Sequence, residues 1–347
     1  MTEFPPLRYG ILGAANIARQ FTRGLAGSTV ASVDAVASRG LEKAQAFAAE
    51  LGIPRALGSY EALLADPEID AIYVPLPNHM HAEWVLKAIA AGKHVLCEKP
   101  LAMTTADARA MFAAAHSKGV MFAEAYPYMS QPQTLRMREL IAEGTIGRVQ
   151  LVTAAFGFSI VTPEGVPTVD PANIRLDPNA GGGALLDAGT YAMSLVRIAA
   201  GEAPTRVLAL ARYTTTGVDQ TVAATLQFAS GMMAQITTSL GTAGNRWAVV
   251  VGDKGVIETG YSNHAPPGAA TLPLRVKRGA PNTVPFETEE LPGTDGFKAE
   301  GESFARMVRL GASHWNGASE AESIDTVRAL EAIAKSARSG EWVDLAP

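Results

Sequence analysis

The residues best suited to proton transfer are an aspartate and a tyrosine that follow a run of glycines. Three consecutive glycines, at 181–183, precede a stretch with helical spacing, and Asp187 and Tyr191 lie four residues apart within it. Residues at this spacing share one face of a helix. An acid and a phenol on one face, beside a loop that permits close backbone approach, could move a proton to and from a substrate. A buried Asp–Tyr hydrogen bond that anchors the helix is the alternative interpretation.

A lysine with distinctive neighbours lies earlier in the chain. Lys99 follows a short strand-like run and stands between Glu98 and Pro100. A lysine beside a nicotinamide ring can hydrogen-bond a substrate hydroxyl and favour its alkoxide. A salt bridge with Glu98 is compatible with this role, because Glu98 could orient the lysine. Cys97, directly before them, is interpreted as a small apolar residue and not as a nucleophile.

A second polar segment follows another strand-like run. Leu76, Pro77 and Asn78 come just after that run, where open α/β sheets bind ligands, so we expect them to contact a cofactor. Asn78 could instead cap the next helix. His81 is a candidate cofactor contact, with a structural role as the alternative. His79 and His81 would point in different directions on a helix, so no metal-binding pair is expected.

The segment between the first strand and the first helix has a degenerate glycine pattern. Gly13 stands where a dinucleotide fold makes its tight turn, but Ala15 and Ala18 replace the second and third glycines of G-x-G-x-x-G. The start of the following helix would offer free N–H groups to a pyrophosphate. An ordinary strand-to-helix turn is the alternative. The predicted phosphate contacts are Gly13, Ala14, Ala15, Asn16 and Ile17.

The end of the second strand predicts which dinucleotide is bound. Sites for NAD usually carry an acidic residue there for the ribose 2′-hydroxyl. This chain has Ser38 and Arg39, with Lys43 one turn later, whereas Asp34 lies four residues earlier, within the strand-like run. Hydroxyl and guanidinium groups suit a 2′-phosphate. The sequence therefore favours NADP(H), with an ordinary polar loop as the alternative.

These residues depend on an alternation of strands and helices over residues 8–125. The strand-like runs are apolar on both faces, which is typical of a doubly wound parallel sheet. The predicted strands are 8–12, 30–38, 70–75, 94–97 and 120–125. The predicted helices are 16–25, 41–51, a short one between 59 and 67, 78–91 and 104–118. The fold class is α/β, with a Rossmann domain at 1–126.

The pattern changes after Tyr126. A helix at 130–141 precedes a long strand at 148–158, and a loop leads to a helix at 185–200. Several strand-like runs joined by turns fill 205–284, and helices at 299–310 and 320–338 close the chain. This pattern predicts a second, α+β domain at 127–347 with an open, mostly antiparallel sheet and helices on one face. The exposed face of such a sheet would favour a homodimer or homotetramer.

Composition excludes several classes of protein. The chain has 347 residues, 48% of them hydrophobic and 18% charged, which is ample for two folded cores. A single cysteine rules out an intrachain disulfide framework and cysteine-rich zinc modules. The net charge of −5 gives no electrostatic case for nucleic acid or an anionic membrane. No apolar run suits a membrane helix and no leader is recognisable, so we expect a cytoplasmic protein without a metal.

Together these motifs resemble the Gfo/Idh/MocA family, which includes glucose–fructose oxidoreductase and inositol dehydrogenase. The resemblance covers nearly the whole chain, in order, and rests most on the Glu-Lys-Pro motif at 98–100 combined with the later Asp-x-x-x-Tyr at 187–191. It implies that Lys99, Asp187 and Tyr191 are the catalytic group. Tyr191, where inositol dehydrogenases typically carry histidine, implies the branch of glucose–fructose oxidoreductase, dihydrodiol dehydrogenase and aldose dehydrogenase.

The resemblance also implies a reaction. Tyr191 would take the proton of a sugar hydroxyl at C1 while hydride passes to NADP⁺, giving a lactone. A tyrosine ordinarily titrates near 10, so the positive charge of Lys99 would help it act as a base. Asp187 would orient Tyr191 or bind a neighbouring hydroxyl, and Arg175 would contact cofactor or sugar. Tightly bound NADP would allow a second sugar to be reduced in turn. A cis Lys99–Pro100 bond is also implied.

Two alternatives remain open from the sequence. A trans-dihydrodiol or dicarbonyl reductase would want an aromatic-lined pocket instead of the hydrogen bonds that recognise a sugar or polyol. A non-catalytic, NADP-sensing regulator need not keep Lys99, Asp187 and Tyr191, all of which are present here. No tyrosine is followed four residues later by lysine, and the cysteines of a zinc alcohol dehydrogenase are lacking, so those classes are not favoured.

Overall fold

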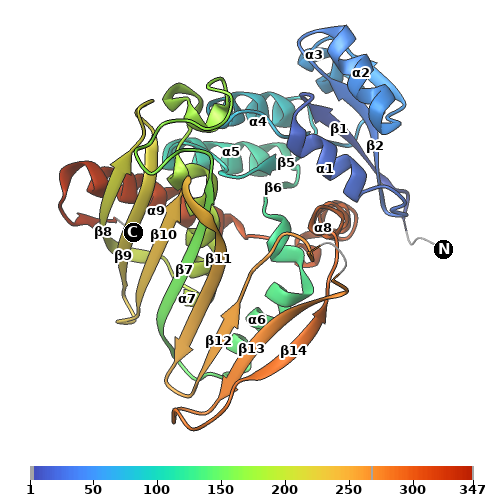
Figure 1. Cartoon of the computed structure of the whole chain (residues 1–347). Helices are drawn as coiled ribbons and strands as arrows, with labels where there is room; N and C mark the ends of the chain where they lie inside the picture. The colour runs from blue at the N-terminus through green and yellow to red at the C-terminus, as the bar shows by residue number, and fades with distance from the viewer. Residues whose placement is uncertain (1–3, 267–268, 346–347) are drawn as a thin grey trace. The chain divides into compact units, whose positions relative to one another are not determined.

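The computed structural model describes residues 4–266 and 269–345, which form two compact units (Figure 1). Of these residues, the first unit comprises 4–102, 106–131 and 294–320, and the second comprises 103–105, 132–266, 269–293 and 321–345. Within the two described ranges, no helix is both long enough and apolar enough to cross a membrane. The predicted cytoplasmic location stays a prediction.

A six-stranded parallel sheet forms the centre of the first unit, in the order β3-β2-β1-β4-β5-β6. This confirms the predicted doubly wound sheet. The strands are β1 (Leu7–Leu12), β2 (Ala31–Ala37), β3 (Arg55–Leu57), β4 (Ala71–Val74), β5 (His94–Glu98) and β6 (Phe122–Ala125). The helices are α1 (Asn16–Gly24), α2 (Leu41–Leu51), α3 (Tyr60–Leu64), η1 (Asn78–Met80), α4 (His81–Ala90), α5 (Thr105–Lys118), η2 (Pro127–Ser130), α8 (Gly296–Leu310) and η6 (Ala312–His314).

The core of this unit lies on both faces of the sheet. Tyr9 of β1 packs against Phe21 of α1 and Phe304 of α8, with ring centroids 5.3 and 6.2 Å apart. Gly10, the next residue, points to the opposite face, where a Cβ would lie 2.8 Å from the Leu63 side chain of α3. Helices therefore cover both faces, which explains why the strands are apolar on both sides.

Residues 294–320 belong to the first unit although they come late in the chain. The Tyr9 hydroxyl donates a hydrogen bond to the Gly301 carbonyl oxygen at 2.9 Å, deep in the core. Gly301 is also a point of close approach, since a Cβ there would lie 2.9 Å from the Leu25 side chain. The first compact unit thus contains a segment that lies within the predicted second domain, beyond the single division at residue 126.

The second unit is built on a nine-stranded sheet in the order β14-β13-β12-β11-β7-β10-β9-β8-β15. Every neighbouring pair is antiparallel except β7 and β10, so the open, mostly antiparallel sheet is confirmed. Its strands are β7 (Val149–Ser159), β8 (Pro204–Tyr213), β9 (Asp219–Phe228), β10 (Met233–Ser239), β11 (Gly241–Gly252), β12 (Gly255–Thr259), β13 (Thr271–Arg278), β14 (Glu287–Pro292) and β15 (Val343–Asp344).

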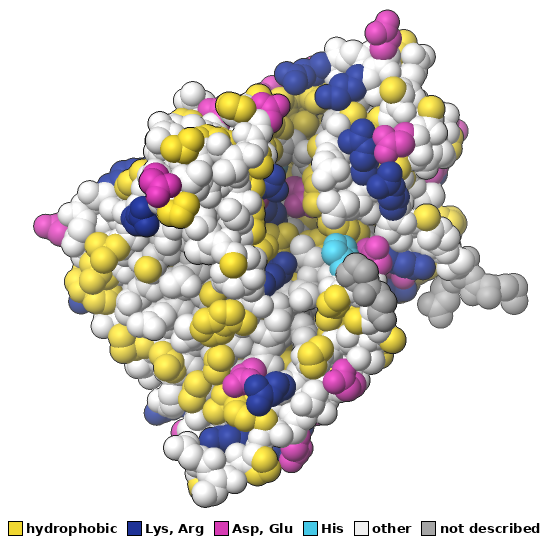
Figure 2. Space-filling view, viewed as in Figure 1, with side chains coloured by type: hydrophobic (Ala, Val, Ile, Leu, Met, Phe, Trp, Pro, Cys, Tyr) yellow, Lys and Arg dark blue, Asp and Glu magenta, His cyan; other side chains and the backbone are white. Residues whose placement is uncertain are grey.

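The two faces of this sheet differ in exposure. Helix α7 packs on β7 and β10, and α6 packs on β13 and β14. The opposite face presents exposed apolar side chains, including Leu151, Met233 and Trp247, and Figure 2 shows such side chains among polar ones over these strands. The predicted dimer or tetramer stays a prediction. The helices of the unit are α6 (Pro132–Ala142), η3 (Ile174–Leu176), η4 (Pro178–Ala180), the π-helical turn η5 (Leu185–Gly189), α7 (Thr190–Ala200) and α9 (Glu320–Ser339).

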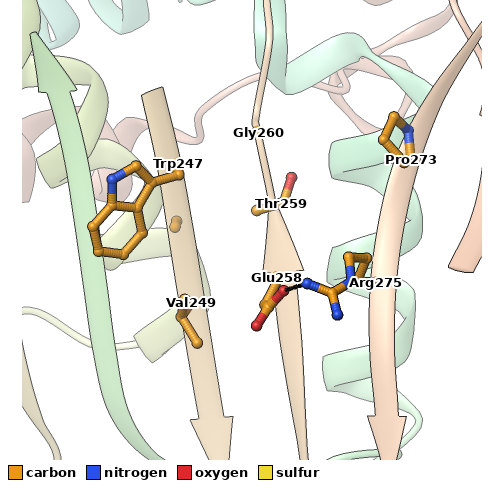
Figure 3. Close-up of a pocket in the computed structure, with 8 residues that line it drawn as sticks. Trp247, Val249, Glu258, Thr259, Gly260, Pro273 and Arg275 are labelled. Atoms are coloured by element: carbon orange, nitrogen blue, oxygen red, sulfur yellow. Dashed lines mark hydrogen bonds and ion pairs between the residues drawn. The ribbon is translucent and has the colours of Figure 1, made fainter. Parts of the chain in front are cut away.

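A shallow depression crosses three strands on that face (Figure 3). Trp247 and Val249 extend from β11, and Glu258 of β12 forms an ion pair with Arg275 of β13. Pro273 lies beyond them on β13. None of the residues predicted for the active site lines this depression.

Candidate active site

The turn between β1 and α1 has the form that a pyrophosphate site requires. Gly13 has a φ of +103°, a conformation that favours glycine, and a Cβ there would lie 3.1 Å from the Leu76 side chain. Among the described residues, no side chain caps the start of α1 at Asn16. The N–H groups of its first turn are therefore available to an anion. Asn16 is exposed, and Ala14, Ala15 and Ile17 are partly so.

The groups after β2 fit a 2′-phosphate. Ser38 is buried, and its N–H donates to the Leu57 carbonyl oxygen at 3.1 Å, while Arg39 and Lys43 are exposed. Asp34 lies inside β2 and accepts a hydrogen bond from the Ser32 hydroxyl at 2.6 Å. The segment 38–43 therefore presents two cations, Arg39 and Lys43, and one carboxylate, Glu42.

The contacts of His81 favour a structural role. Its side chain is fully buried, and its two ring nitrogens lie 2.9 Å from the Pro100 carbonyl oxygen and 2.8 Å from that of Leu76. Burial lowers the pKa of His81, and the Lys99 cation acts in the same direction. His81 therefore holds together the loops that follow β4 and β5. A contact with the cofactor would require the ring to leave these partners. Pro77 and Asn78, in contrast, are partly exposed.

The Glu-Lys-Pro motif lies at the end of β5, over a cluster of buried acids. Glu98 is buried and accepts a hydrogen bond from the Tyr73 hydroxyl, and Lys99 is half-buried. The Lys99–Pro100 peptide bond is cis, which confirms that prediction. Burial, together with the carboxylates of Glu98 and Glu124, raises the pKa of Glu300 well above its usual range.

Cys97, at the same strand end, is fully buried, and burial raises the pKa of its thiol well above the usual range. A thiol held in this form is a poor nucleophile. This supports the interpretation of Cys97 as a small apolar residue.

The glycine run of the second unit allows close backbone packing. Gly183 has a φ of +110°, and a Cβ there would lie 2.3 Å from the Asp219 carboxylate. A Cβ at Gly182 would lie 2.6 Å from the Arg175 carbonyl oxygen. The Asp219 carboxylate accepts a hydrogen bond from the Leu185 N–H at 2.6 Å, at the start of the helical segment. Asp219 is thus a positioning residue that the sequence did not reveal.

The predicted helix at 185–200 begins with a π-helical turn, η5, and continues as α7. Asp187 lies in η5 and forms an ion pair with Arg175, with 2.6 Å between Asp187 Oδ2 and Arg175 Nε. Tyr191 lies in the first turn of α7 and is 5% exposed. Arg175, which was predicted to contact cofactor or sugar, therefore orients the acid of the predicted catalytic group.

Three residues from distant strands and loops surround Tyr191. The ring of Phe156, on β7, meets the Tyr191 ring edge-on at 5.4 Å between centroids. The Arg246 guanidinium, from β11, lies 4.5 Å from the centre of the Tyr191 ring. The Asn263 amide nitrogen lies 3.4 Å from the Tyr191 hydroxyl oxygen. Arg246 and Asn263 were not predicted from the sequence. The register of β7 with β11 brings Arg246 opposite Phe156, and Asn263 follows β12, which pairs with β11 on its other side.

No group of three or more His, Cys, Asp or Glu side chains within the described residues could hold a metal ion.

Comparisons with known proteins agree with both units. A family model described as "Oxidoreductase family, NAD-binding Rossmann fold" matches residues 7–126, and the "GFO/IDH/MocA C-terminal domain" matches residues 134–258. D-xylose 1-dehydrogenase (NADP(+)) 2 of Haloferax volcanii is 37% identical over 340 residues, which covers 98% of this chain and 100% of the relative. Mouse trans-1,2-dihydrobenzene-1,2-diol dehydrogenase is 37% identical over 255 residues, 73% of this chain and 74% of the relative.

Solved structures of two oxidoreductases are similar to this chain over nearly its whole length. The aldose–aldose oxidoreductase from Caulobacter crescentus, complexed with glycerol, superposes with a TM-score of 0.84 at 28% identity, over 98% of this chain and all of the other. A 3-ketoreductase from Actinomadura kijaniata, in complex with NADP and TDP-benzene, superposes with a TM-score of 0.82 at 29% identity, over 95% and 98% of the two chains. By sequence and by fold, the chain belongs to the Gfo/Idh/MocA family of oxidoreductases, with an N-terminal NAD(P)-binding Rossmann fold.

Proposed function

We propose that the protein is an NADP(H)-dependent sugar oxidoreductase that oxidises an aldose at C1 to a lactone. The observation that carries this proposal is the full-length similarity to an NADP(+)-dependent D-xylose 1-dehydrogenase, at 37% identity. The Caulobacter aldose–aldose oxidoreductase, which shares the fold over the whole chain, supports the same substrate class. The reverse reaction would reduce a carbonyl, so a retained cofactor would allow a second sugar to be reduced.

The first unit supplies the groups proposed to hold NADP(H). The turn at 13–17 would bind the pyrophosphate, and Ser38, Arg39 and Lys43 would bind the 2′-phosphate. When bound, the nicotinamide of NADP⁺ would supply the acceptor for the hydride that leaves C1. The further proposed contacts at the carboxyl edge of the sheet are Leu76, Pro77, Asn78, Glu98 and Lys99.

Tyr191 is assigned as the acceptor of the proton that the C1 hydroxyl of the sugar loses. As the C1 hydroxyl becomes a carbonyl, its O–H bond breaks and the proton passes to the phenolate oxygen of Tyr191, which becomes a neutral hydroxyl. We assign Lys99 to a hydrogen bond with the reacting oxygen, which favours its alkoxide. Asp187, oriented by Arg175 at 2.6 Å, would accept a hydrogen bond from a neighbouring sugar hydroxyl. Together these three side chains form the proposed catalytic group.

A second candidate function, the oxidation of a trans-dihydrodiol, has its own support. Trans-1,2-dihydrobenzene-1,2-diol dehydrogenases from several vertebrates are 34–37% identical to this chain. The rings of Phe156 and Phe158 lie 5.9 Å apart, and Phe156 contacts Tyr191. An aromatic wall beside the proposed base would suit a cyclic diol with an apolar face.

Substrate panels and one substitution test the proposal. The purified protein is assayed with aldoses and with trans-diols, each with NADP⁺ and with NAD⁺, by the absorbance of the reduced nicotinamide. We expect turnover of an aldose with NADP⁺, and loss of about a hundredfold or more in Tyr191→Phe. Tyr213→Phe, at an exposed position on β8, is the matched control. Preference for the diols would select the second candidate, and near-normal turnover in Tyr191→Phe would remove the tyrosine from the mechanism.

A further inference from the structure

Arg246 lies inside a set of aromatic rings that includes the proposed base. In the antiparallel pair of β11 with β7, Arg246 stands opposite Phe156, so both side chains point to the face that α7 covers. The guanidinium carbon lies 4.6 Å from the centre of the Phe156 ring and 4.5 Å from that of Tyr191. A guanidinium at these distances is attracted to the ring faces.

A third ring, Tyr261, completes the set at 4.7 Å from the guanidinium carbon. Tyr261 is fully buried, and its hydroxyl donates to the Ala155 carbonyl oxygen at 2.6 Å. Its φ of +33° is the only positive value among the described non-glycine residues. A bulky residue adopts this conformation only where the surroundings hold it, and such residues are found mainly at functional sites.

Asn263 connects the cation to the tyrosine oxygen. Its amide oxygen accepts a hydrogen bond from Arg246 Nη2 at 3.1 Å. Because a guanidinium can only donate, the amide oxygen must face Arg246 and the amide nitrogen must face Tyr191. That nitrogen lies 3.4 Å from the Tyr191 hydroxyl oxygen, which it can reach as a donor. A hydrogen bond received by the phenol oxygen favours its ionised form.

We propose that Arg246, held by Phe156, Tyr261 and Asn263, is a positioning residue that stabilises the phenolate form of Tyr191. The inference rests on the proposed function in one respect, that Tyr191 is the base. It adds that a cation from the same unit, Arg246 of β11, acts on this tyrosine. Sugar oxidation would then depend on Arg246 through the ionisation of Tyr191 and not through contact with the sugar.

Few other ionisable groups face Tyr191 from the described part of the second unit. Asp187, one turn before it, is paired with Arg175, and Tyr261 is neutral because burial raises its pKa despite the opposing effect of Arg246. Strands β7 and β10, which pack on α7, contain no ionisable side chain. The other charged groups on or beside α7 form ion pairs elsewhere: Arg197 with Asp325, Arg136 with Glu289, and Arg138 with Glu322.

The test follows the ionisation of Tyr191 directly. Phenolate absorbs in the ultraviolet at longer wavelength than phenol, so each protein is titrated against the same protein carrying Tyr191→Phe. The difference spectrum reports Tyr191 alone, in the full chain without substrate. The proteins compared are the wild type, Arg246→Met and Arg246→Lys. The control is Arg275→Met, because Arg275 lies over the Phe286 ring at a matching 4.6 Å but on β13.

The expected result is a displaced titration. In Arg246→Met the phenolate band should appear about one pH unit or more higher than in the wild type. Arg246→Lys keeps the charge and should show a smaller displacement, and Arg275→Met should show none. An unchanged titration in Arg246→Met, or an equal displacement in Arg275→Met, would overturn the inference. If circular dichroism shows that Arg246→Met does not fold, Asn263→Ala decides, and an unchanged titration there also overturns it.

Kinetics separate this role from a structural one. The acid limb of kcat against pH should move upward in Arg246→Met by the displacement seen in the titration. A fall in kcat at every pH, with the limb unmoved, would contradict the inference. Because the titration needs no turnover, it still reports on Arg246 if the wild type fails to oxidise any sugar. That failure would reject the proposed function alone.

Discussion

The buried acid beneath the Glu-Lys-Pro motif makes a prediction about stability. Glu300, on α8, is fully buried, and the carboxylates of Glu98 and Glu124 act on it across the core of the first unit. Both burial and these neighbours raise its pKa well above the usual range, so the folded protein holds a proton there that the unfolded chain loses. Replacing Glu300 with glutamine keeps the shape of the side chain and removes the ionisable group.

The size of the effect follows from proton linkage. In the unfolded chain a glutamate ionises near pH 4.3, and above that value the unfolded state binds fewer protons than the folded one. The free energy of unfolding of the wild type should therefore fall by about 1.4 kcal/mol for each pH unit, until the pKa of the folded state is passed. Glu300→Gln should lack this contribution and gain stability over the wild type as the pH rises.

The measurement is urea unfolding of the wild type and of Glu300→Gln at pH 5.0, 5.5 and 6.0, a window of about one unit above the unfolded pKa. Glu61→Gln is the control, because Glu61 is exposed on α3. We expect the two slopes against pH to differ by about 1.4 kcal/mol per unit, and the control to match the wild type. Parallel slopes for Glu300→Gln and the wild type would show that Glu300 ionises as usual, and would refute the reasoning.

Two further predictions concern one position in each unit. Arg39→Ala should weaken the binding of NADPH by about tenfold to a hundredfold, because a charged hydrogen bond to the 2′-phosphate is lost, and should leave the binding of NADH nearly unchanged. Equal losses of affinity for the two cofactors in a binding titration would reject the 2′-phosphate assignment. Gly183→Ala should destabilise the protein by about 1–3 kcal/mol in urea unfolding, since its Cβ would meet the Asp219 carboxylate at a φ of +110°. Gly244→Ala, with open space around it, is the control, and equal stability of the two variants would contradict the packing described.

The strands of the first unit could be predicted because parallel strands buried on both faces give continuous apolar runs. Strand β3 was missed, since Arg55–Leu57 is only three residues long and half-buried, with no apolar pattern. The membership of α8 in this unit was also missed. It depends on contacts such as the one between Tyr9 and Gly301, which lie 292 residues apart in the chain.

Some residues of the candidate site could likewise be predicted from the sequence and others could not. Asp187 and Tyr191 could be predicted because a helical spacing and a glycine run stand beside each other in the sequence. Arg246 could not, because its environment depends on the β7–β11 register and on the left-handed backbone at Tyr261. The π-helical turn that carries Asp187 likewise has no pattern of its own. Its start is fixed by Asp219, which is 34 residues away from Leu185.

In the proposed reaction, hydride leaves C1 of an aldose for NADP⁺. The most direct measurement uses an aldose that carries deuterium at C1, with the protein and NADP⁺, followed by mass spectrometry of the reduced nicotinamide and of the sugar product. We predict one deuterium in the NADPH, none at C1 of the product, and a lactone as that product. NADPH without deuterium, or a product that retains deuterium at C1, would contradict the account.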